Sequence, residues 1–148
     1  MNQIGVPFHM LVLGPFNRTD VVCTFSTERM STNSETEALI EEAWQSRIAA
    51  ARTRGQSLFP GPMCRFEGWS VVDGQLQINF GLTDYREFVG TNIVNPTIQT
   101  SFGEAFLANG TGVCSILLTA DNQIIIQRRS QSVFEHPGML NFCGGSLN

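Results

Sequence analysis

One stretch of helical periodicity stands in a chain that is otherwise patterned for β-strands. The side chains that would share one face of this helix are Ile40, Ala43, Trp44, Arg47, Ile48 and Ala51. Ser34 and Glu37 precede this face with the spacing of a capping box, and Gly55 follows it as a helix stop. We therefore expect one clear helix that begins near Ser34 and ends before Gly55.

After this helix, the period of the apolar residues becomes that of strands. CRFEGWSVV and LQINFGLT flank Asp73-Gly74, a dipeptide that is typical of tight hairpin turns. GVCSILLT and QIIIQRRS flank a second turn at residues 120–122, and a further strand pair is expected at residues 9–13 and 20–25. A brief helix is expected at residues 101–108. These patterns predict an α+β fold that is rich in antiparallel strands.

The charged residues exclude some classes of partner. The chain has nine basic and thirteen acidic residues, a net charge of −4, and every basic residue is an arginine. Arginine suits the recognition of an anion at a few sites, whereas binding to a nucleic-acid backbone needs a basic run that is absent from this sequence. We expect no nucleic-acid partner.

The N-terminus and the cysteines indicate the compartment. The first apolar run is interrupted by His9, Gly14 and Pro15, so it predicts neither a secretion signal nor a membrane span. The four cysteines allow two disulfides by number but have no metal-binding spacing. We expect an intracellular, cytoplasmic protein in a reduced state.

Two adjacent arginines end the second apolar hairpin. Adjacent side chains of a strand point to opposite faces, so at most one of Arg128 and Arg129 can face a given ligand. One of the two arginines could therefore bind an anionic ligand. The alternative, from the residues alone, is that both are solvated charges on an edge strand.

The C-terminal segment resembles the opening of a Nudix hydrolase domain. Its hairpin ends in Arg-Arg-Ser and is followed by a Pro-Gly loop, a short strand and Gly144-Gly145. The family's signature helix begins at the second glycine of such a pair, and its catalytic glutamates come later. We therefore expect this sequence to be the truncated N-terminal part of a longer protein.

A second segment narrows the resemblance. Residues 81–92, GLTDYREFVGTN, and the helical segment EEAWQSR are similar to a Nudix branch that includes UDP-glucose pyrophosphatases. The resemblance implies an N-terminal extension over residues 1–108 and the first part of a Nudix domain over residues 109–148. The whole protein would have a mixed α/β/α Nudix fold. This chain would hold only the first part of that fold, which would be incomplete at its C-terminus.

The resemblance also implies an activity. Members of this branch hydrolyse UDP-glucose or UDP-galactose to UMP and a sugar 1-phosphate, with Mg²⁺ held by glutamates of the signature helix. Those glutamates do not occur in this sequence. We therefore expect no catalytic residue, no Mg²⁺ site and no hydrolysis by this chain alone. The alternative is a short, non-catalytic protein that binds a nucleotide sugar or another partner.

Several substrate contacts carry over from the branch to this chain: Phe59, Tyr85, Arg129, Phe134, Asn141, Ser146 and Asn148. Phe59 would stack on uracil, Tyr85 would hydrogen-bond the ligand, and Arg129 would grip the diphosphate. Phe134 would line the substrate site, where its backbone could serve as well as its side chain. The alternatives are that Phe59 fills the core and that the Tyr85 hydroxyl is bonded to the backbone of residues 91–92.

This chain departs from the branch at three of these contacts. Ser146 and Asn148 stand where relatives commonly have His and Glu, and Asn141 replaces an acidic residue that some members have. The changes at Ser146 and Asn148 concern the recognition of the sugar.

Overall fold

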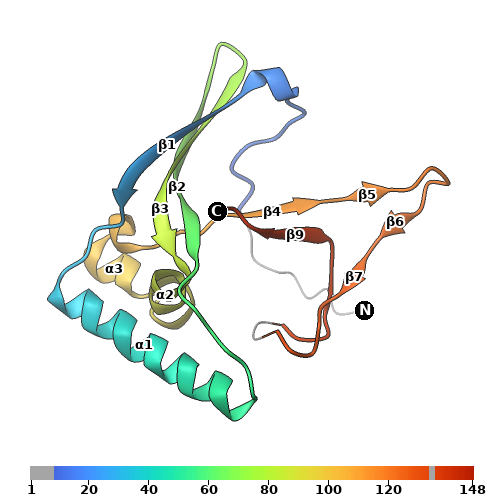
Figure 1. The fold of residues 1–148 in the computed structure, drawn as a ribbon. Helices are drawn as coiled ribbons and strands as arrows, with labels where there is room; N and C mark the ends of the chain where they lie inside the picture. The colour runs from blue at the N-terminus through green and yellow to red at the C-terminus, as the bar shows by residue number, and fades with distance from the viewer. Residues whose placement is uncertain (1–8, 134–135) are drawn as a thin grey trace, which may run out of the picture.

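The computed structural model describes residues 9–133 and 136–148, which form a small sheet with helices at one end and a long hairpin arm (Figure 1). The sheet has the order β1-β3-β2, with β1 at Val21–Arg29, β2 at Pro62–Val72 and β3 at Gln75–Asp84. Helices and several sheets in one chain confirm the α+β class. No helix within the described residues is both long and apolar enough to cross a membrane.

Short helices lie at the end of the sheet beside the long helix α1, and one further helical turn precedes β1 at the opposite end (Figure 1). The helical elements are η1 (Arg18–Asp20), α1 (Ser34–Thr53), α2 (Tyr85–Phe88), the π-helical η2 (Val89–Val94), α3 (Ile98–Phe102) and η3 (Glu104–Phe106). The expected helix at residues 101–108 is wrong in its bounds. Gly103 has a positive φ of 93°, which ends α3 and separates it from η3.

The arm consists of short antiparallel pairs. Its strands are β4 (Gly112–Ser115), β5 (Leu117–Leu118), β6 (Ile124–Ile125), β7 (Gln127–Arg128), β8 (Leu140–Asn141) and β9 (Cys143–Ser146), paired β4-β9, β5-β6 and β7-β8. The β5-β6 hairpin projects away from the three-stranded sheet (Figure 1). Both predicted hairpins are therefore present.

Helix α1 buries the predicted face but starts with a different cap. Ile40, Ala43, Trp44 and Ala51 are buried, whereas Arg47 and Ile48 of that face are half-buried.

Asn33 caps the helix. Asn33 Oδ1 accepts from the Thr36 backbone N–H at 2.9 Å, and Thr36 Oγ1 accepts from the Asn33 backbone N–H at 3.0 Å. The predicted Ser34–Glu37 capping box is wrong because Asn33 already has the extended backbone of an N-cap, and Ser34 is helical.

Strand β1 pairs in parallel with β3, which the sequence patterns did not indicate. The strand expected at residues 20–25 is present as part of β1, although residue 20 lies in η1. Residues 9–13 form no strand, so the expected pairing between the two segments is wrong. β1 instead aligns its apolar side chains with those of β3. Phe25, for example, stacks on Phe80 with ring centroids 5.3 Å apart.

A buried carboxylate joins β1, β3 and α2. Glu87 is 7% exposed, and its Oε1 accepts from Arg29 Nη2 at 2.7 Å. Its Oε2 accepts from Thr83 Oγ1 at 2.7 Å and from the Asp84 backbone N–H at 3.2 Å, which completes a capping box at α2. The hydrogen bond to Glu87 holds the pKa of Arg29 above its usual range.

The residues after Glu87 pack α2 and η2 against their neighbours. A Cβ at Gly90 would lie 2.7 Å from Ile40 Cα, so the two helical segments touch through backbone. Asn92 Oδ1 accepts from the Asn109 backbone N–H at 2.9 Å, and Asn92 Nδ2 donates to Asn109 Oδ1 at 3.0 Å. Most of the GLTDYREFVGTN segment is therefore architectural.

Substituting Gly90→Ala should force α1 and η2 apart. We expect a loss of about 1–3 kcal/mol in the free energy of unfolding, the usual result of overpacking a tight contact. Urea titration followed by circular dichroism measures it. Gly145→Ala is the control, since a Cβ there meets nothing within 4 Å; equal stability of both variants would contradict the close contact.

Substituting Glu87→Ala should also destabilise the fold. The change leaves the Thr83 hydroxyl and Arg29 without this acceptor, and we expect a loss of about 1–3 kcal/mol, moderated by the exposure of Arg29. The same urea titration tests it against Glu42→Ala on the exposed side of α1. A Glu87 variant as stable as the Glu42 variant would show that the buried carboxylate is dispensable.

Candidate functional site

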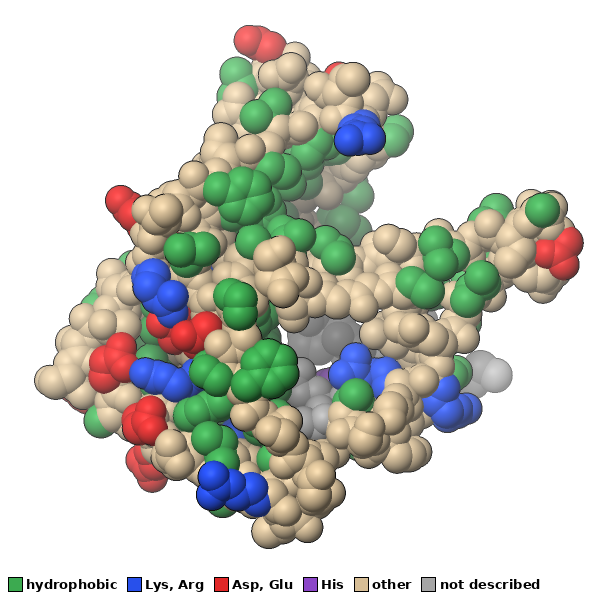
Figure 2. Space-filling view, in the orientation of Figure 1, with side chains coloured by type: hydrophobic (Ala, Val, Ile, Leu, Met, Phe, Trp, Pro, Cys, Tyr) green, Lys and Arg blue, Asp and Glu red, His purple; other side chains and the backbone are tan. Residues whose placement is uncertain are grey.

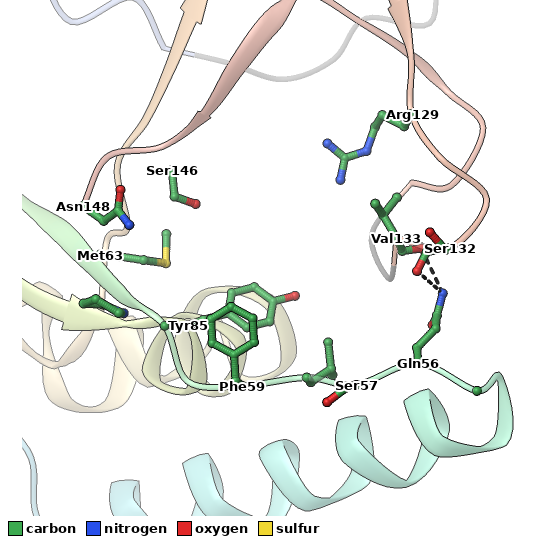
Figure 3. Close-up of a pocket in the computed structure, with 14 residues that line it drawn as sticks. Gln56, Ser57, Phe59, Met63, Tyr85, Arg129, Ser132, Val133, Ser146 and Asn148 are labelled. Atoms are coloured by element: carbon green, nitrogen blue, oxygen red, sulfur yellow. Dashed lines mark hydrogen bonds between the residues drawn. The ribbon is translucent and has the colours of Figure 1, made fainter.

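A cavity of about 660 Å³ lies between the helical end of the sheet and the hairpin arm. Figure 2 shows this face of the molecule hollowed there, and Figure 3 shows the side chains around the cavity. Its lining comes from separate segments: Gly55, Gln56, Ser57, Leu58, Phe59, Gly61, Pro62, Met63, Tyr85, Arg129, Ser132, Val133, Ser146 and Asn148. A volume of this order is typical of sites for small molecules.

The end of α1 directs the chain into the cavity wall. Gly55 has a positive φ of 67°, its N–H donates to the Arg52 carbonyl, and the Gln56 N–H donates to the Ala51 carbonyl. These two bonds form a Schellman motif, which satisfies the last carbonyls of the helix and reverses the chain. The residues that follow Gly55 therefore line the cavity.

Phe59 presents its ring to the cavity and not to the core. Phe59 is 73% exposed, so the alternative that it fills the core is wrong. The Gly61 N–H donates to the Phe59 carbonyl at 2.9 Å, and a Cβ on Gly61 would lie 2.9 Å from Phe59 Cε2. Gly61 thus leaves room for the ring in this tight turn.

Tyr85 lies next to Phe59 because the same glycine joins their segments. The Tyr85 backbone N–H donates to the Gly61 carbonyl at 2.9 Å. The Tyr85 ring packs edge-on against buried Trp44, with centroids 6.0 Å apart and an interplanar angle of 84°. Since Tyr85 is the first residue of α2, the Asp84–Glu87 cap fixes its backbone.

Arg129 lies across the cavity from Phe59 and Tyr85 (Figure 3). Its backbone N–H donates to the Met139 carbonyl and its carbonyl accepts from the Gly138 N–H, so it continues the pairing of β7 and β8. Among the described residues that line the cavity, Arg129 has the only charged side chain. Arg128 does not line it and donates instead to the Gly138 carbonyl at 2.8 Å.

Ser146 and Asn148 line the third side of the cavity. Between them, the Leu147 N–H donates to the Thr111 carbonyl and the Leu147 carbonyl accepts from the Cys64 N–H. These bonds extend the strand pairing beyond β9, and the alternation of an extended chain places Ser146 and Asn148 on the same side.

The structure does not bring all the predicted contacts together. Asn141 lies in β8 opposite Gln127 and is not among the lining residues. Phe134 lies outside the described residues. Five predicted contacts line the same cavity: Phe59, Tyr85, Arg129, Ser146 and Asn148. Their roles in ligand binding stay predictions.

Sequence patterns missed other lining residues. Gln56, Met63, Ser132 and Val133 belong to segments that read only as loop or strand end. The signal for Gln56 is its place directly after the helix-stop glycine, which marks where the chain turns.

The described residues hold no group of three or more His, Cys, Asp or Glu side chains that could bind a metal ion. The cysteines Cys23, Cys64, Cys114 and Cys143 are all free.

Comparison with known proteins identifies relatives, although no family model matches the chain. The uridine diphosphate glucose pyrophosphatase NUDT22 of Mus musculus is 35% identical over 118 residues, and that of Homo sapiens is 33% identical over 119 residues. Nudix hydrolase 9 of Arabidopsis thaliana is 33% identical over 121 residues.

Each of these matches covers 72% of this chain but only 37% or 38% of the relative. The chain therefore spans well under half the length of the curated relatives that it matches. It is related to the Nudix hydrolase family, and its resemblance to the UDP-glucose pyrophosphatase-type members is confirmed.

Proposed function

We propose that the cavity binds the uridine diphosphate part of a nucleotide sugar. The chain would supply the substrate-binding part of a Nudix-type hydrolase that converts UDP-glucose or UDP-galactose to UMP and a sugar 1-phosphate. One observation carries the proposal: side chains singled out from the sequence at positions 59, 85, 129, 146 and 148 line one cavity. The names of the relatives, UDP-glucose pyrophosphatases, agree with it.

The chemistry of the lining suits such a ligand. The exposed face of Phe59 can stack on a uracil ring, and Tyr85 beside it adds a hydroxyl that donates or accepts. Across the cavity, the Arg129 guanidinium can pair with diphosphate oxygens in a bidentate manner. None of the described lining residues is an Asp or a Glu.

The remaining contacts would face the sugar. Ser146 and Asn148 carry a hydroxyl and an amide, both of which bond to sugar hydroxyls without charge. In this proposal, residues 1–108 act as an extension that provides Phe59 and Tyr85, and residues 109–148 begin the Nudix domain that provides Arg129.

These residues take no part in a metal-dependent step. The described side chains do not fit Mg²⁺, because no cluster of suitable ligands is present among them. In the family, the metal ligands belong to the helix that follows the glycine matched by Gly145. Binding of the nucleotide sugar and its hydrolysis are therefore separable, and a non-catalytic binding protein is the second candidate.

Substituting Arg129→Ala should weaken the binding of UDP-glucose roughly 10- to 100-fold, since it removes a charge-assisted bond of about 1.5–3 kcal/mol to the diphosphate. Isothermal titration calorimetry of the full 148-residue chain measures this.

The matched control is Arg128→Ala, which removes the same charge one residue away, outside the cavity. An equal loss of affinity in both variants would show that the net charge of the chain, and not a specific contact with Arg129, determines the affinity for UDP-glucose. Absence of binding by the unsubstituted chain would overturn the proposal.

The 148-residue chain with Mg²⁺ should release no UMP from UDP-glucose above the background without protein. The physical reason is that the carboxylates that hold the metal in the family are absent from these residues. Chromatographic detection of UMP tests it, with a full-length relative as positive control. Robust Mg²⁺-dependent turnover would show that another set of residues performs the chemistry.

A further inference from the structure

Gln56 joins two walls of the cavity through its side chain. Its Nε2 donates to the Ser132 carbonyl at 2.6 Å and to the Val133 carbonyl at 3.3 Å (Figure 3). These partners are 76 and 77 residues further along the chain. One amide therefore connects the end of α1 with the segment that follows Arg129.

Backbone hydrogen bonds at the end of α1 hold the near side of this link. The Gln56 backbone N–H belongs to the Schellman motif that ends α1, where it donates to the Ala51 carbonyl at 2.9 Å. The orientation of the side-chain amide is also determined. Nε2 can donate to two carbonyls, whereas a flipped amide would place Oε1 against both of these oxygens.

The far side of the link is a short, ordered connection to Arg129. Ser130 Oγ and Ser132 Oγ are hydrogen-bonded at 2.7 Å, and Ser130 Oγ accepts from the Ser132 backbone N–H at 3.1 Å. This local turn carries the chain from Arg129 to the carbonyls that Gln56 holds. Since the Arg129 backbone is also bonded to Gly138 and Met139, its place is set from both sides.

We propose that Gln56 is a positioning residue for ligand binding. It holds the Arg129 wall opposite Phe59 and Tyr85, so that one ligand contacts the aromatic wall and the guanidinium at the same time. The inference rests on the proposed function, because the ligand is taken to be a nucleoside diphosphate. Its physical basis is preorganisation: a wall that is already in place does not lose conformational freedom when the ligand binds.

The test is a double-substitution cycle with Gln56→Met and Arg129→Ala. Methionine is similar in length to glutamine and uncharged, so it removes the donor without adding repulsion to a diphosphate. We expect Gln56→Met to raise the Kd for UDP-glucose roughly tenfold in the unsubstituted chain, and less than about twofold when Arg129 is already alanine. NMR titration of the full chain reaches the millimolar affinities that this requires.

Gln99→Met is the matched control, because Gln99 is exposed on α3 and lies outside the cavity. It should leave the Kd unchanged. Equal weakening by Gln56→Met in both Arg129 backgrounds would show a general structural role and overturn the positioning role. An unchanged Kd would overturn it as well.

Hydrogen exchange in the ligand-free chain separates this inference from the proposed function. If Gln56 holds the wall, Gln56→Met should speed exchange of the amides at residues 130–133, while those of β2 and β3 keep their protection. Failure of the unsubstituted chain to bind UDP-glucose would refute the proposed function alone. Unchanged exchange at residues 130–133 would refute the link through Gln56.

Discussion

The buried carboxylate of Glu87, paired with the half-exposed Arg29, makes the interaction on which the rest of the structure depends. A buried carboxylate is costly unless its lone pairs are satisfied, and here a guanidinium, a hydroxyl and a backbone amide satisfy them. These donors belong to β1 and to the end of β3, where Asp84 is also the N-cap of α2. The arrangement therefore fixes where the sheet stops and where Tyr85 begins the next helix.

The segment that carries the family resemblance is mostly structural. Glu87 and Gly90 join elements of the fold, Asn92 is paired with Asn109, and Arg86 forms an ion pair with Glu37 of α1 at 3.1 Å. Of residues 81–92, only Tyr85 lines the cavity. A segment that carries a family resemblance can thus consist mostly of residues that hold one ligand-facing side chain, here Tyr85, in place.

Whether a feature of the fold could be predicted depends on how far apart along the chain the residues that form it lie. Helix α1 and the hairpin at Asp73-Gly74 follow from local periodicity and turn chemistry, so they were predictable. The parallel pairing of β1 with β3 joins residues such as Thr24 and Asn79, which are 55 positions apart, and no local pattern expresses it. The contact between Gln56 and Ser132 is hidden for the same reason, whereas Phe59 and Arg129 were found by resemblance.

The walls of the cavity come from segments that are far apart in the chain, and this links ligand binding to folding. An unfolded chain cannot bring Phe59, Arg129 and Ser146 to one place, so a ligand of the cavity binds the native state alone. Such a ligand present at a hundred times its Kd adds about 2.7 kcal/mol to the free energy of unfolding. In a cell, the concentration of this ligand would then help to set the fraction of the chain that is folded and therefore escapes proteolysis.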